Sequence, residues 1–377
     1  MKKLLLSMLA ISALAVTSCS SDDDNNNNND NTTIDPTDFK GTLVDGDVAT
    51  LDASVTYKLT GSFVIGDGAQ LTIPAGTRIE AEGGTSAYIA VAQGGEIFVE
   101  GTATNPVVMT SASATPAEGD WGGLVICGKA NTNKGGSTGQ TATSEVGDLT
   151  YGGTIDNDSS GSVRYLRVEY TGATFTNQKE FNGVSLFGVG SGTTFEYVQS
   201  YNGGDDGIEF FGGAVNGKYI IAVGSGDDSI DFADGWKGTG EYWYIKDGAK
   251  AGIEGSNNGD DFAATPTTTA TLKNISVVGG GSEGGIYIKE GGGIWNVENF
   301  YVDGYEKGIH VKNSTDDSVA NAHIDNDEIT FSNVKFVNVT DETSYEGTNT
   351  DFYTVGENTG AGNGSATPAW ATGWARF

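Results

Sequence analysis

Carboxylate side chains recur at one position of a short segment that is repeated through the middle of the chain. Glu209, Asp231 and Glu254 each directly follow an isoleucine. Neighbouring residues of a β-strand point to opposite faces, so an inward isoleucine would place each acid on the outer face. Three stacked carboxylates could supply the acid and base that cleave a glycosidic bond, or they could form a solvated acidic face.

Basic and aromatic side chains continue the same outer face in later repeats. Tyr287 and His310 occupy the position of the acids, and Lys289 and Lys312 lie two residues further on. A lysine or histidine can act as the base of an elimination, with Ca²⁺ neutralising a uronate carboxylate. The candidate catalytic residues are therefore Glu209, Asp231, Glu254, Lys289, His310 and Lys312.

Two pairs of aspartates precede the acids by a few residues. Asp205 and Asp206 lie three and two residues before one isoleucine, and Asp227 and Asp228 lie equally before the next. Two carboxylate pairs at neighbouring positions repel each other unless protons or a cation compensate them. Ca²⁺, which takes six to eight oxygen ligands, is the candidate cofactor. The alternative is ordinary turn chemistry, in which aspartate accepts hydrogen bonds from nearby backbone.

Aromatic side chains near these segments could stack on sugar rings. The candidate carbohydrate-binding residues are Trp236, Trp243, Tyr287 and Trp295. Packing between structural layers or under loops is the alternative role for such large side chains.

Composition excludes several classes of function. The 377 residues include 50 acidic and 20 basic side chains, for a formal net charge of −30, so nucleic acid is not expected as a partner. The two histidines exclude a histidine-rich transition-metal site. The 58 glycines follow no collagen period. They instead suit a chain that turns sharply many times.

A sequence repeat must position these residues. The anchors Val184, Ile208, Ile230, Ile253, Ile286 and Ile309 recur at intervals of about 22 to 33 residues. Each repeat holds short alternating runs, typical of strands, that are too small to bury an apolar face without stacking on neighbours. We predict an all-β, single-stranded, right-handed parallel β-helix of about 11 coils. Coil spacing would put Glu209 about 9.6 Å from Glu254, near the carboxyl separation of inverting glycosidases. Asp206 and Asp228, on adjacent coils, would form a closer pair.

The N-terminus carries an export signal. Lys2 and Lys3 precede an apolar run, 4–16, that is too short to span a bilayer, and small residues precede Cys19. This pattern resembles a bacterial lipoprotein signal in which Cys19 is lipidated; an ordinary secretory signal is the alternative. The acidic residues after Cys19 resemble the surface-export signal of Bacteroidota lipoproteins, which implies the cell outer membrane with display at the cell surface rather than periplasmic retention.

Segments of the first half carry a second resemblance. The strings LTIPAGTRI, GTATNPVVMTS and WGGLVICG resemble the early coils of right-handed β-helix proteins from Bacteroidota. Proteins of this fold include polysaccharide lyases and polygalacturonase-like hydrolases, and NGGDDGI and SGDDSI are similar to the paired-aspartate motif of the latter. The Asn-Thr-Asp, Gly-His-Gly and Arg-Ile-Lys strings of those hydrolases are missing in the expected order, which puts their activity in doubt.

These observations divide the chain into a signal peptide (1–18), a disordered acidic tether (19–40), the β-helix (41–340) and a C-terminal cap or tail (341–377). We expect the tail to fold back on the rod through Trp370, Trp374 and Phe377; a sorting or docking signal is the alternative. Cys127 is expected to be a small buried hydrophobe.

The expected function is binding of extracellular polysaccharide by a monomeric surface lipoprotein, with Ca²⁺ as a candidate cofactor and the membrane contacted only through the lipid anchor. A polysaccharide lyase or glycoside hydrolase, and a non-catalytic adhesin, are the alternatives.

Overall fold

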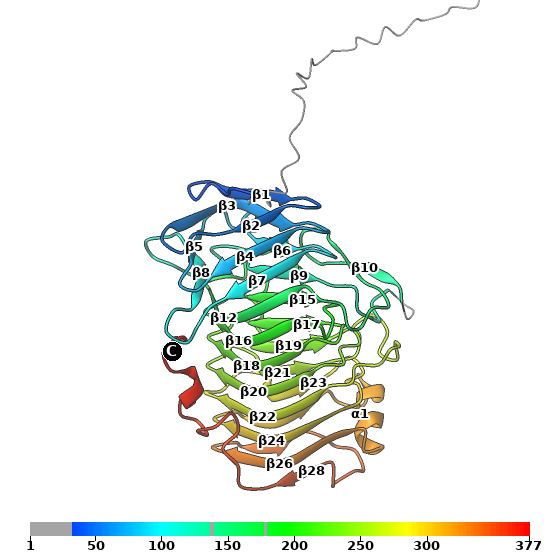
Figure 1. The fold of residues 1–377 in the computed structure, drawn as a ribbon. Coiled ribbons are helices and arrows are strands. Elements are labelled where there is room, and N and C mark those ends of the chain that lie inside the picture. The colour runs from blue at the N-terminus through cyan, green and yellow to red at the C-terminus, as the bar shows by residue number, and fades with distance from the viewer. Residues whose placement is uncertain (1–31, 136–138, 177–178) are drawn as a thin grey trace, which may run out of the picture. The chain divides into compact units, whose positions relative to one another are not determined.

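The computed structural model describes residues 32–377 apart from 136–138 and 177–178. The predicted signal peptide, Cys19 and most of the predicted tether therefore lie outside the described residues. Within the described residues, one hydrogen-bonded sheet of 24 strands coils around a continuous apolar interior, and the strand pairings in this sheet are parallel (Figure 1). No helix in these ranges combines the length and apolar character needed to cross a membrane.

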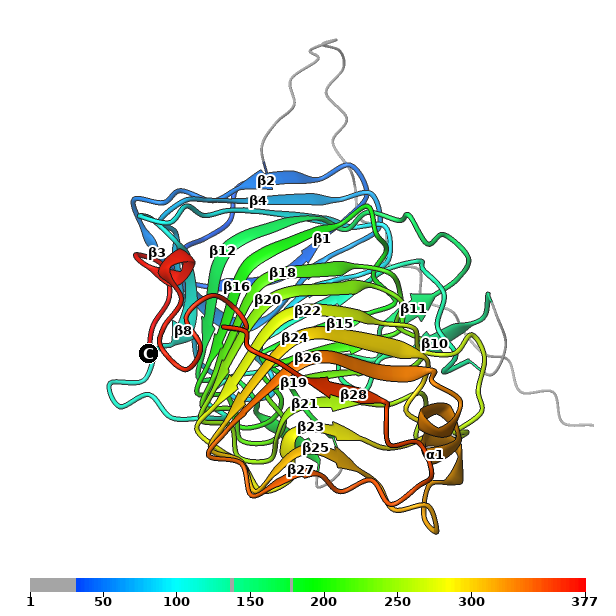
Figure 2. The same cartoon turned by 90° about the horizontal axis from the view of Figure 1, so that it is seen from below.

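Strands at equivalent places in successive coils stack into ladders, which Figure 2 shows end-on. Among the described residues, ladder A comprises eleven strands: β2 (Val48–Thr50), β4 (Gln70–Pro74), β7 (Glu96–Glu100), β12 (Gly161–Glu169), β16 (Thr194–Tyr201), β18 (Asn216–Val223), β20 (Thr239–Lys246), β22 (Thr271–Val278), β24 (Trp295–Asp303), β26 (Ile329–Val337) and β28 (Tyr353–Val355).

Ladder B carries the candidate functional residues. Its eleven described strands are β1 (Phe39–Leu43), β3 (Thr56–Ile65), β6 (Ile89–Val91), β9 (Leu124–Cys127), β15 (Val184–Phe187), β17 (Ile208–Phe211), β19 (Ile230–Ala233), β21 (Ala251–Gly255), β23 (Gly284–Ile288), β25 (Lys307–Val311) and β27 (Asp341–Thr343). The predicted fold, a parallel β-helix of about 11 coils, is confirmed.

A third ladder, ladder C, completes each coil. It begins with the first half of β3, β5 (Arg78–Ala81) and β8 (Val107–Ser111), and it continues into the second half of β12 and of the ladder A strands that follow. The remaining elements are two short hairpins, helix α1 and a 3-10 turn: β10 (Thr141–Thr143) with β11 (Thr150–Gly152), β13 (Thr174–Thr176) with β14 (Lys179–Glu180), α1 (Ser318–Asp325) and η1 (Ala369–Ala371).

A row of residues with positive φ makes the corner between ladders A and C. Tyrosine and asparagine occupy this left-handed conformation, which costs a non-glycine residue energy unless neighbours compensate it. The tyrosines stack ring on ring at 4.3 to 5.0 Å, and the asparagines bond amide to amide along the row. The row is Tyr165, Tyr197, Tyr219, Tyr242, Asn274, Asn299 and Asn333. Stacking between equivalent positions therefore stabilises each corner.

The isoleucine anchors point into the interior. Ile208, Ile230, Ile253, Ile286 and Ile309 are completely buried and pair in register from coil to coil. The residues that follow them must consequently face outward, as the sequence predicts.

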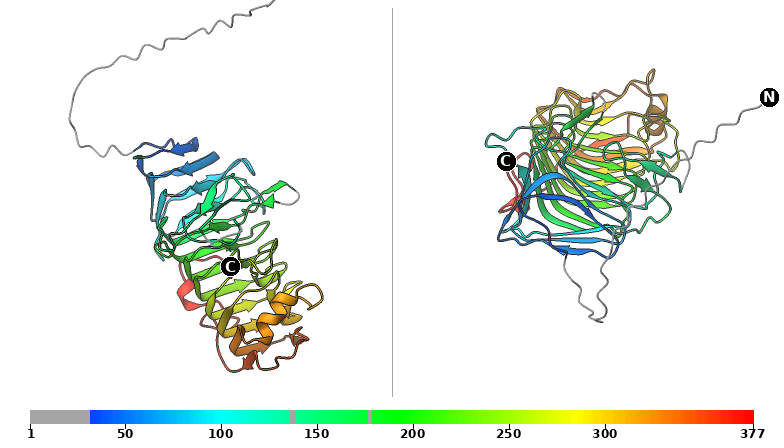
Figure 3. Two further views of the ribbon diagram at one scale, coloured as in Figure 1. Left: turned by 90° about the vertical axis from the view of Figure 1, so that its right-hand side faces the viewer. Right: turned by 90° about the horizontal axis from the view of Figure 1, so that it is seen from above.

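The C-terminal segment, residues 356–377, leaves β28 and runs back along the outside of the rod (Figures 1 and 3). Trp374 meets Tyr165 and Tyr197 edge to face, with ring centroids 5.9 and 6.0 Å apart. The predicted fold-back is therefore observed for residues 356–377. The predicted start of the tail at residue 341 is wrong, because β27 and β28 continue the ladders to residue 355.

Replacement of Ile230 by alanine should lower the free energy of unfolding by about 2–5 kcal/mol, because the neighbouring isoleucines cannot close the cavity. Urea titration measures the effect, and Ser282→Ala on the exposed surface is the control, with an expected change within about 0.5 kcal/mol. An equal, small effect of both changes would contradict the assigned inward register.

Candidate functional site

The register of ladder B brings the predicted acids together. Glu209 pairs with Asp231, and Asp231 pairs with Glu254, on three successive strands. The same outward row continues through Tyr287 to His310. The predicted order of acids followed by aromatic and basic residues is thus the observed one.

The acids do not line an open groove. Asp231 is 8% exposed and Glu254 is 4% exposed, while Glu209 is partly exposed. Both roles considered for the row, cleavage of a glycosidic bond and a solvated acidic face, need exposed carboxylates, so the burial of Asp231 and Glu254 contradicts both roles for these two residues. Asp231 also occupies the position between Glu209 and Glu254, where an inverting hydrolase needs room for water.

Two polar side chains contact the ends of this acidic row. Asn182 donates a 2.6 Å hydrogen bond from Nδ2 to Glu209 Oε2. The Nζ of Lys289 lies 2.9 Å from Oε1 of Glu254. Burial acts against the charged lysine, but the Glu254 carboxylate raises the pKa of Lys289 above its ordinary value. Lys289 is consequently protonated at neutral pH and is not the general base predicted as one possibility.

Asp231, in the middle of the row, lacks such a contact. Its Oδ1 is buried without a hydrogen-bond donor among the described residues. Burial first, and then repulsion from Asp228, raise the pKa of Asp231 well above its ordinary value. Burial and neighbouring carboxylates raise the pKa values of Asp206, Glu209 and Glu254 in the same way. This region needs protons or a cation to balance its charge.

The aspartate pairs play two different parts. Asp206 Oδ1 accepts a 2.9 Å hydrogen bond from the backbone N–H of Asp228, and Asp228 Oδ1 accepts one of 2.6 Å from Ala251. Both bonds join adjacent coils, between residues 22 and 23 positions apart in the sequence, so they are not the local turn bonds given as the alternative. Asp227 instead forms an ion pair with Lys250, and burial raises the pKa of Asp205 to about 7.

Among the described residues, three groups of acids have oxygens close enough to share a cation, and the first two groups share Asp206. In each group, one oxygen of every member lies within 4.8 Å of the others. The groups are Asp205 with Asp206 and Asp227, Asp206 with Glu209 and Asp231, and Asp228 with Glu254 and Glu283. The first group contains three of the four predicted metal ligands, and the second adds two residues predicted as catalytic. Carboxylate oxygens in this arrangement suit a hard cation such as Ca²⁺.

Two adjoining pockets lie beyond the acids, over β23 and β25. One, of about 350 Å³, is lined by Glu283, Lys289 and Glu290 among others, and the second, of about 360 Å³, by Lys307 and His310. Both pockets are also lined by Tyr287 and Lys312. Within the described part of the chain, neither Lys307 nor Lys312 has a carboxylate oxygen within 4.0 Å.

His310 has a defined orientation in the second pocket. Its Nδ1 lies 2.5 Å from the carbonyl oxygen of Glu283, so Nδ1 carries the proton and donates it. Its ring stacks on Tyr287 at 4.2 Å, and its Nε2 lies 3.4 Å from Lys307 Nζ. Burial, and then Lys307, lower the pKa of His310, so the imidazole is neutral at neutral pH with a lone pair on Nε2.

The tryptophans predicted to bind sugar are interior residues, and that prediction is wrong. Trp236 and Trp243 are completely buried, and Trp295 is 2% exposed. Each indole N–H donates to a backbone carbonyl of the coil, at 2.9 to 3.0 Å. Large inward side chains fill the rod where glycines leave space, so these rings offer no face to a ligand. Tyr287 alone of the four lines a pocket, although only 6% of it is exposed.

Asn182 and Lys307 were not predicted as site residues from the sequence. Both lie two residues before an anchor, the position that Asp206 and Asp228 hold in the intervening coils. Extending that alignment in both directions would have found them.

Comparison with protein-family models relates the chain to other β-helix proteins. The model for a pectate-lyase-like β-helix domain matches residues 41–375. The chain belongs to this family. The match extends from β1 through all later coils and includes most of the C-terminal segment. The family fold is consistent with polysaccharide binding or lyase activity. Neither the curated proteins nor the solved structures contain a match.

In chelator, the melting temperature should fall as the pH rises from about 5 to about 8. Carboxyl groups with raised pKa values hold protons in the folded state that the unfolded chain releases above about pH 4, so stability is lost as the pH rises towards the folded values, about 7 for Asp205. Added Ca²⁺ should reduce this loss by replacing the protons. Differential scanning calorimetry measures both effects.

Asp231→Asn should weaken the dependence on pH and on Ca²⁺, whereas Asp67→Asn, at a carboxylate that is 81% exposed, should leave both unchanged. A melting temperature that is independent of pH and Ca²⁺ in the unsubstituted protein would contradict the described electrostatics.

Proposed function

We propose that the protein binds an extracellular polysaccharide across the two adjoining pockets over β23 and β25. The observation that carries this proposal is the convergence of Tyr287, His310, Lys307 and Lys312 on one outward face. Concave sites with aromatic walls and a few oriented polar groups are the usual form of ligand-binding sites.

The charges of the second pocket favour an acidic polysaccharide, because Lys307 and Lys312 line it together with a single acidic residue, Glu346. The first pocket is more acidic, since Glu283, Glu290, Asp316 and Asp317 line it beside Lys289 and Lys312. Two lysines without a carboxylate partner among the described residues lie together on a protein whose formal net charge is −30. Elsewhere most lysines form ion pairs, such as Lys218 with Glu241 and Lys273 with Glu298. Lys307 and Lys312 therefore retain the capacity to form charge-assisted hydrogen bonds with uronate carboxylates.

Ca²⁺ is the proposed cofactor of the neighbouring acidic row. The fit rests on Asp231, whose buried Oδ1 has no donor and lies in the group formed with Asp206 and Glu209. A cation held there would neutralise the row and fix the turns that precede β17 and β19. It would act on the pockets indirectly, by holding β21 and β23 in place beside them.

The proposed location is the outer face of the outer membrane. Lipidation of Cys19 would anchor the chain, and the acidic stretch after it would separate the β-helix from the bilayer. A binding face on a tethered rod could then reach polymers outside the cell.

A lyase is the second candidate, because His310 presents a neutral Nε2 towards the second pocket. In such an elimination, Nε2 would take the proton from the carbon next to a uronate carboxylate, and a carbon–carbon double bond would form. The glycosidic carbon–oxygen bond would break, and the departing oxygen would take a proton from water. Lys307 or Lys312 would stabilise the negative charge that develops on the carboxylate.

The double substitution Lys307→Gln with Lys312→Gln should weaken binding of polygalacturonate at least about tenfold, because two charge-assisted contacts are lost. Affinity electrophoresis with and without Ca²⁺ measures the change. Lys246→Gln with Lys273→Gln removes the same charge away from the pockets and should leave binding unchanged. Equal loss in both variants would show non-specific attraction, and no binding by the unsubstituted protein to acidic or neutral polysaccharides would favour the adhesin.

Ultraviolet absorbance of the same mixtures distinguishes the lyase from the binder. Product with an unsaturated end that disappears with His310→Ala would establish elimination. Retention of polysaccharide without such product would establish binding alone.

A further inference from the structure

The C-terminal segment, residues 356–377, contacts coils that are far apart in the rod. Near its start, Asn358 Nδ2 donates to the carbonyl oxygens of Asn333 in β26 and Phe300 in β24. Further on, the backbone N–H of Ala361 donates to Ser276 Oγ in β22, and the carbonyl oxygen of Ser365 accepts from Tyr244 OH in β20. The segment thus crosses one coil after another in the direction opposite to the order of synthesis.

The far end of the segment reaches the middle of the rod. Trp370 packs against Tyr219 of β18 with ring centroids 5.2 Å apart, and Trp374 against Tyr197 of β16. Gln199 of β16 bonds the backbone of Arg376 twice, at 2.6 and 2.8 Å. Figure 1 shows this end, marked C, beside the coils that contain β12 and β16.

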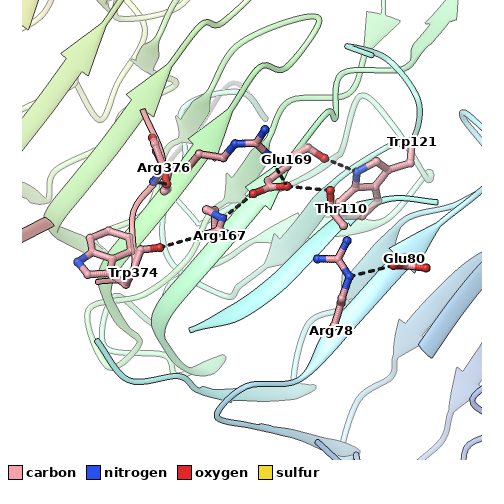
Figure 4. A network of polar contacts seen from close by, with 9 residues as sticks. Arg78, Glu80, Thr110, Trp121, Arg167, Glu169, Trp374 and Arg376 are labelled. Carbon is pink, nitrogen blue, oxygen red and sulfur yellow. Dashed lines mark hydrogen bonds and ion pairs between the residues drawn. The ribbon is translucent and has the colours of Figure 1, made fainter. Parts of the chain in front are cut away.

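A buried carboxylate anchors the final residues, as Figure 4 shows. Glu169 of β12 is 3% exposed and accepts a hydrogen bond from Thr110 and ion pairs from Arg167 and Arg376. Arg167 also donates from Nη1 to the carbonyl oxygen of Trp374 at 3.0 Å. The Arg376 guanidinium lies 4.5 Å from the ring centroid of Tyr201.

Between these two ends the segment covers an apolar strip. Ile221 and Val223 of β18 and Tyr244 of β20 point away from the interior, yet they are 0%, 6% and 1% exposed. They form a separate apolar cluster with Ala371 and Trp374 of the segment. Without the segment this strip would face water.

In a solenoid each coil ordinarily touches only its neighbours, so distant coils can open independently. Here the last residues join β12 directly to β26 across five intervening ladder A strands, β16, β18, β20, β22 and β24. Opening of any coil in that range must break contacts with the segment as well as with the adjacent coils.

We propose that residues 356–377 form a strap that locks the coils from β12 to β26 into one cooperative unit. Since the strap follows these coils in the chain and docks on coils made earlier, this lock closes only after the coils from β12 to β26 have been synthesised. The strap is separate from the proposed polysaccharide site, and the proposal of a strap does not depend on whether that site binds polysaccharide.

Hydrogen exchange of the full-length protein tests the strap. In the unsubstituted protein, β16, β20 and β24 should open together, so their core amides should show the same protection factor. In Trp374→Ala, protection of β24 should fall at least about 100-fold further than protection of β16, because the coils can then open from the C-terminal end. Arg376→Gln is a milder change that preserves the apolar contacts. In this variant, protection of β24 should again fall further than protection of β16, here by about tenfold.

Trp295→Ala is the matched control. It removes a buried tryptophan from the interior of the rod while leaving the strap intact, so the three strands should lose protection together. A common protection factor for the three strands in both Trp374→Ala and Arg376→Gln would overturn the proposal. So would different protection factors for β16, β20 and β24 in the unsubstituted protein.

Discussion

In-register parallel stacking is the constraint on which this structure depends. Each side chain has as its nearest neighbours the equivalent side chains of the coils above and below, about 4.8 Å away. Any preference or penalty at one position is therefore repeated along the rod. The corner between ladders A and C uses this repetition favourably, because stacked tyrosine rings and linked asparagine amides offset the cost of a left-handed backbone.

In-register stacking also decides which charged side chains are neighbours, and the rows on ladders A and B differ in this respect. On the outside of ladder A, acids and bases alternate strictly along the register, so every charge has opposite neighbours. The row is Glu100, Arg164, Glu196, Lys218, Glu241, Lys273 and Glu298. On the outside of ladder B, Glu209, Asp231 and Glu254 follow one another without a base between them. Stacking does not require this arrangement, so the acidic row must be balanced by protons or by a cation, and that need is the physical basis for the Ca²⁺ proposal.

Much of this could be predicted from the sequence because the repeat reports register directly. The isoleucine anchors fixed which residues point outward, and with them the order from Glu209 to His310. Burial of the outward residues was not predictable in the same way. Trp243 lies in β20, where apolar residues occur on both faces. Its neighbour Tyr244, like Ile221 of the adjacent strand β18, is covered by a segment more than a hundred residues away in the sequence. The alternation of apolar and polar residues cannot reveal such a covering segment, so the tryptophans were wrongly predicted to lie on the outer face of the sheet. Asp231 and Glu254 were placed correctly in the row but were wrongly expected to be exposed on the outer face, because strand pairing does not show which other residues cover that face.

We propose that these features form one surface, in which a buried acidic row that needs protons or a cation lies beside a pocket whose Lys307 and Lys312 can bind an anion. A crystal structure grown with Ca²⁺ and an acidic oligosaccharide tests this claim most directly. We expect a cation coordinated by Asp206, Glu209 and Asp231, and a sugar carboxylate within hydrogen-bond distance of Lys307 or Lys312. Sugar bound on another face, with water alone between the three acids, would contradict it.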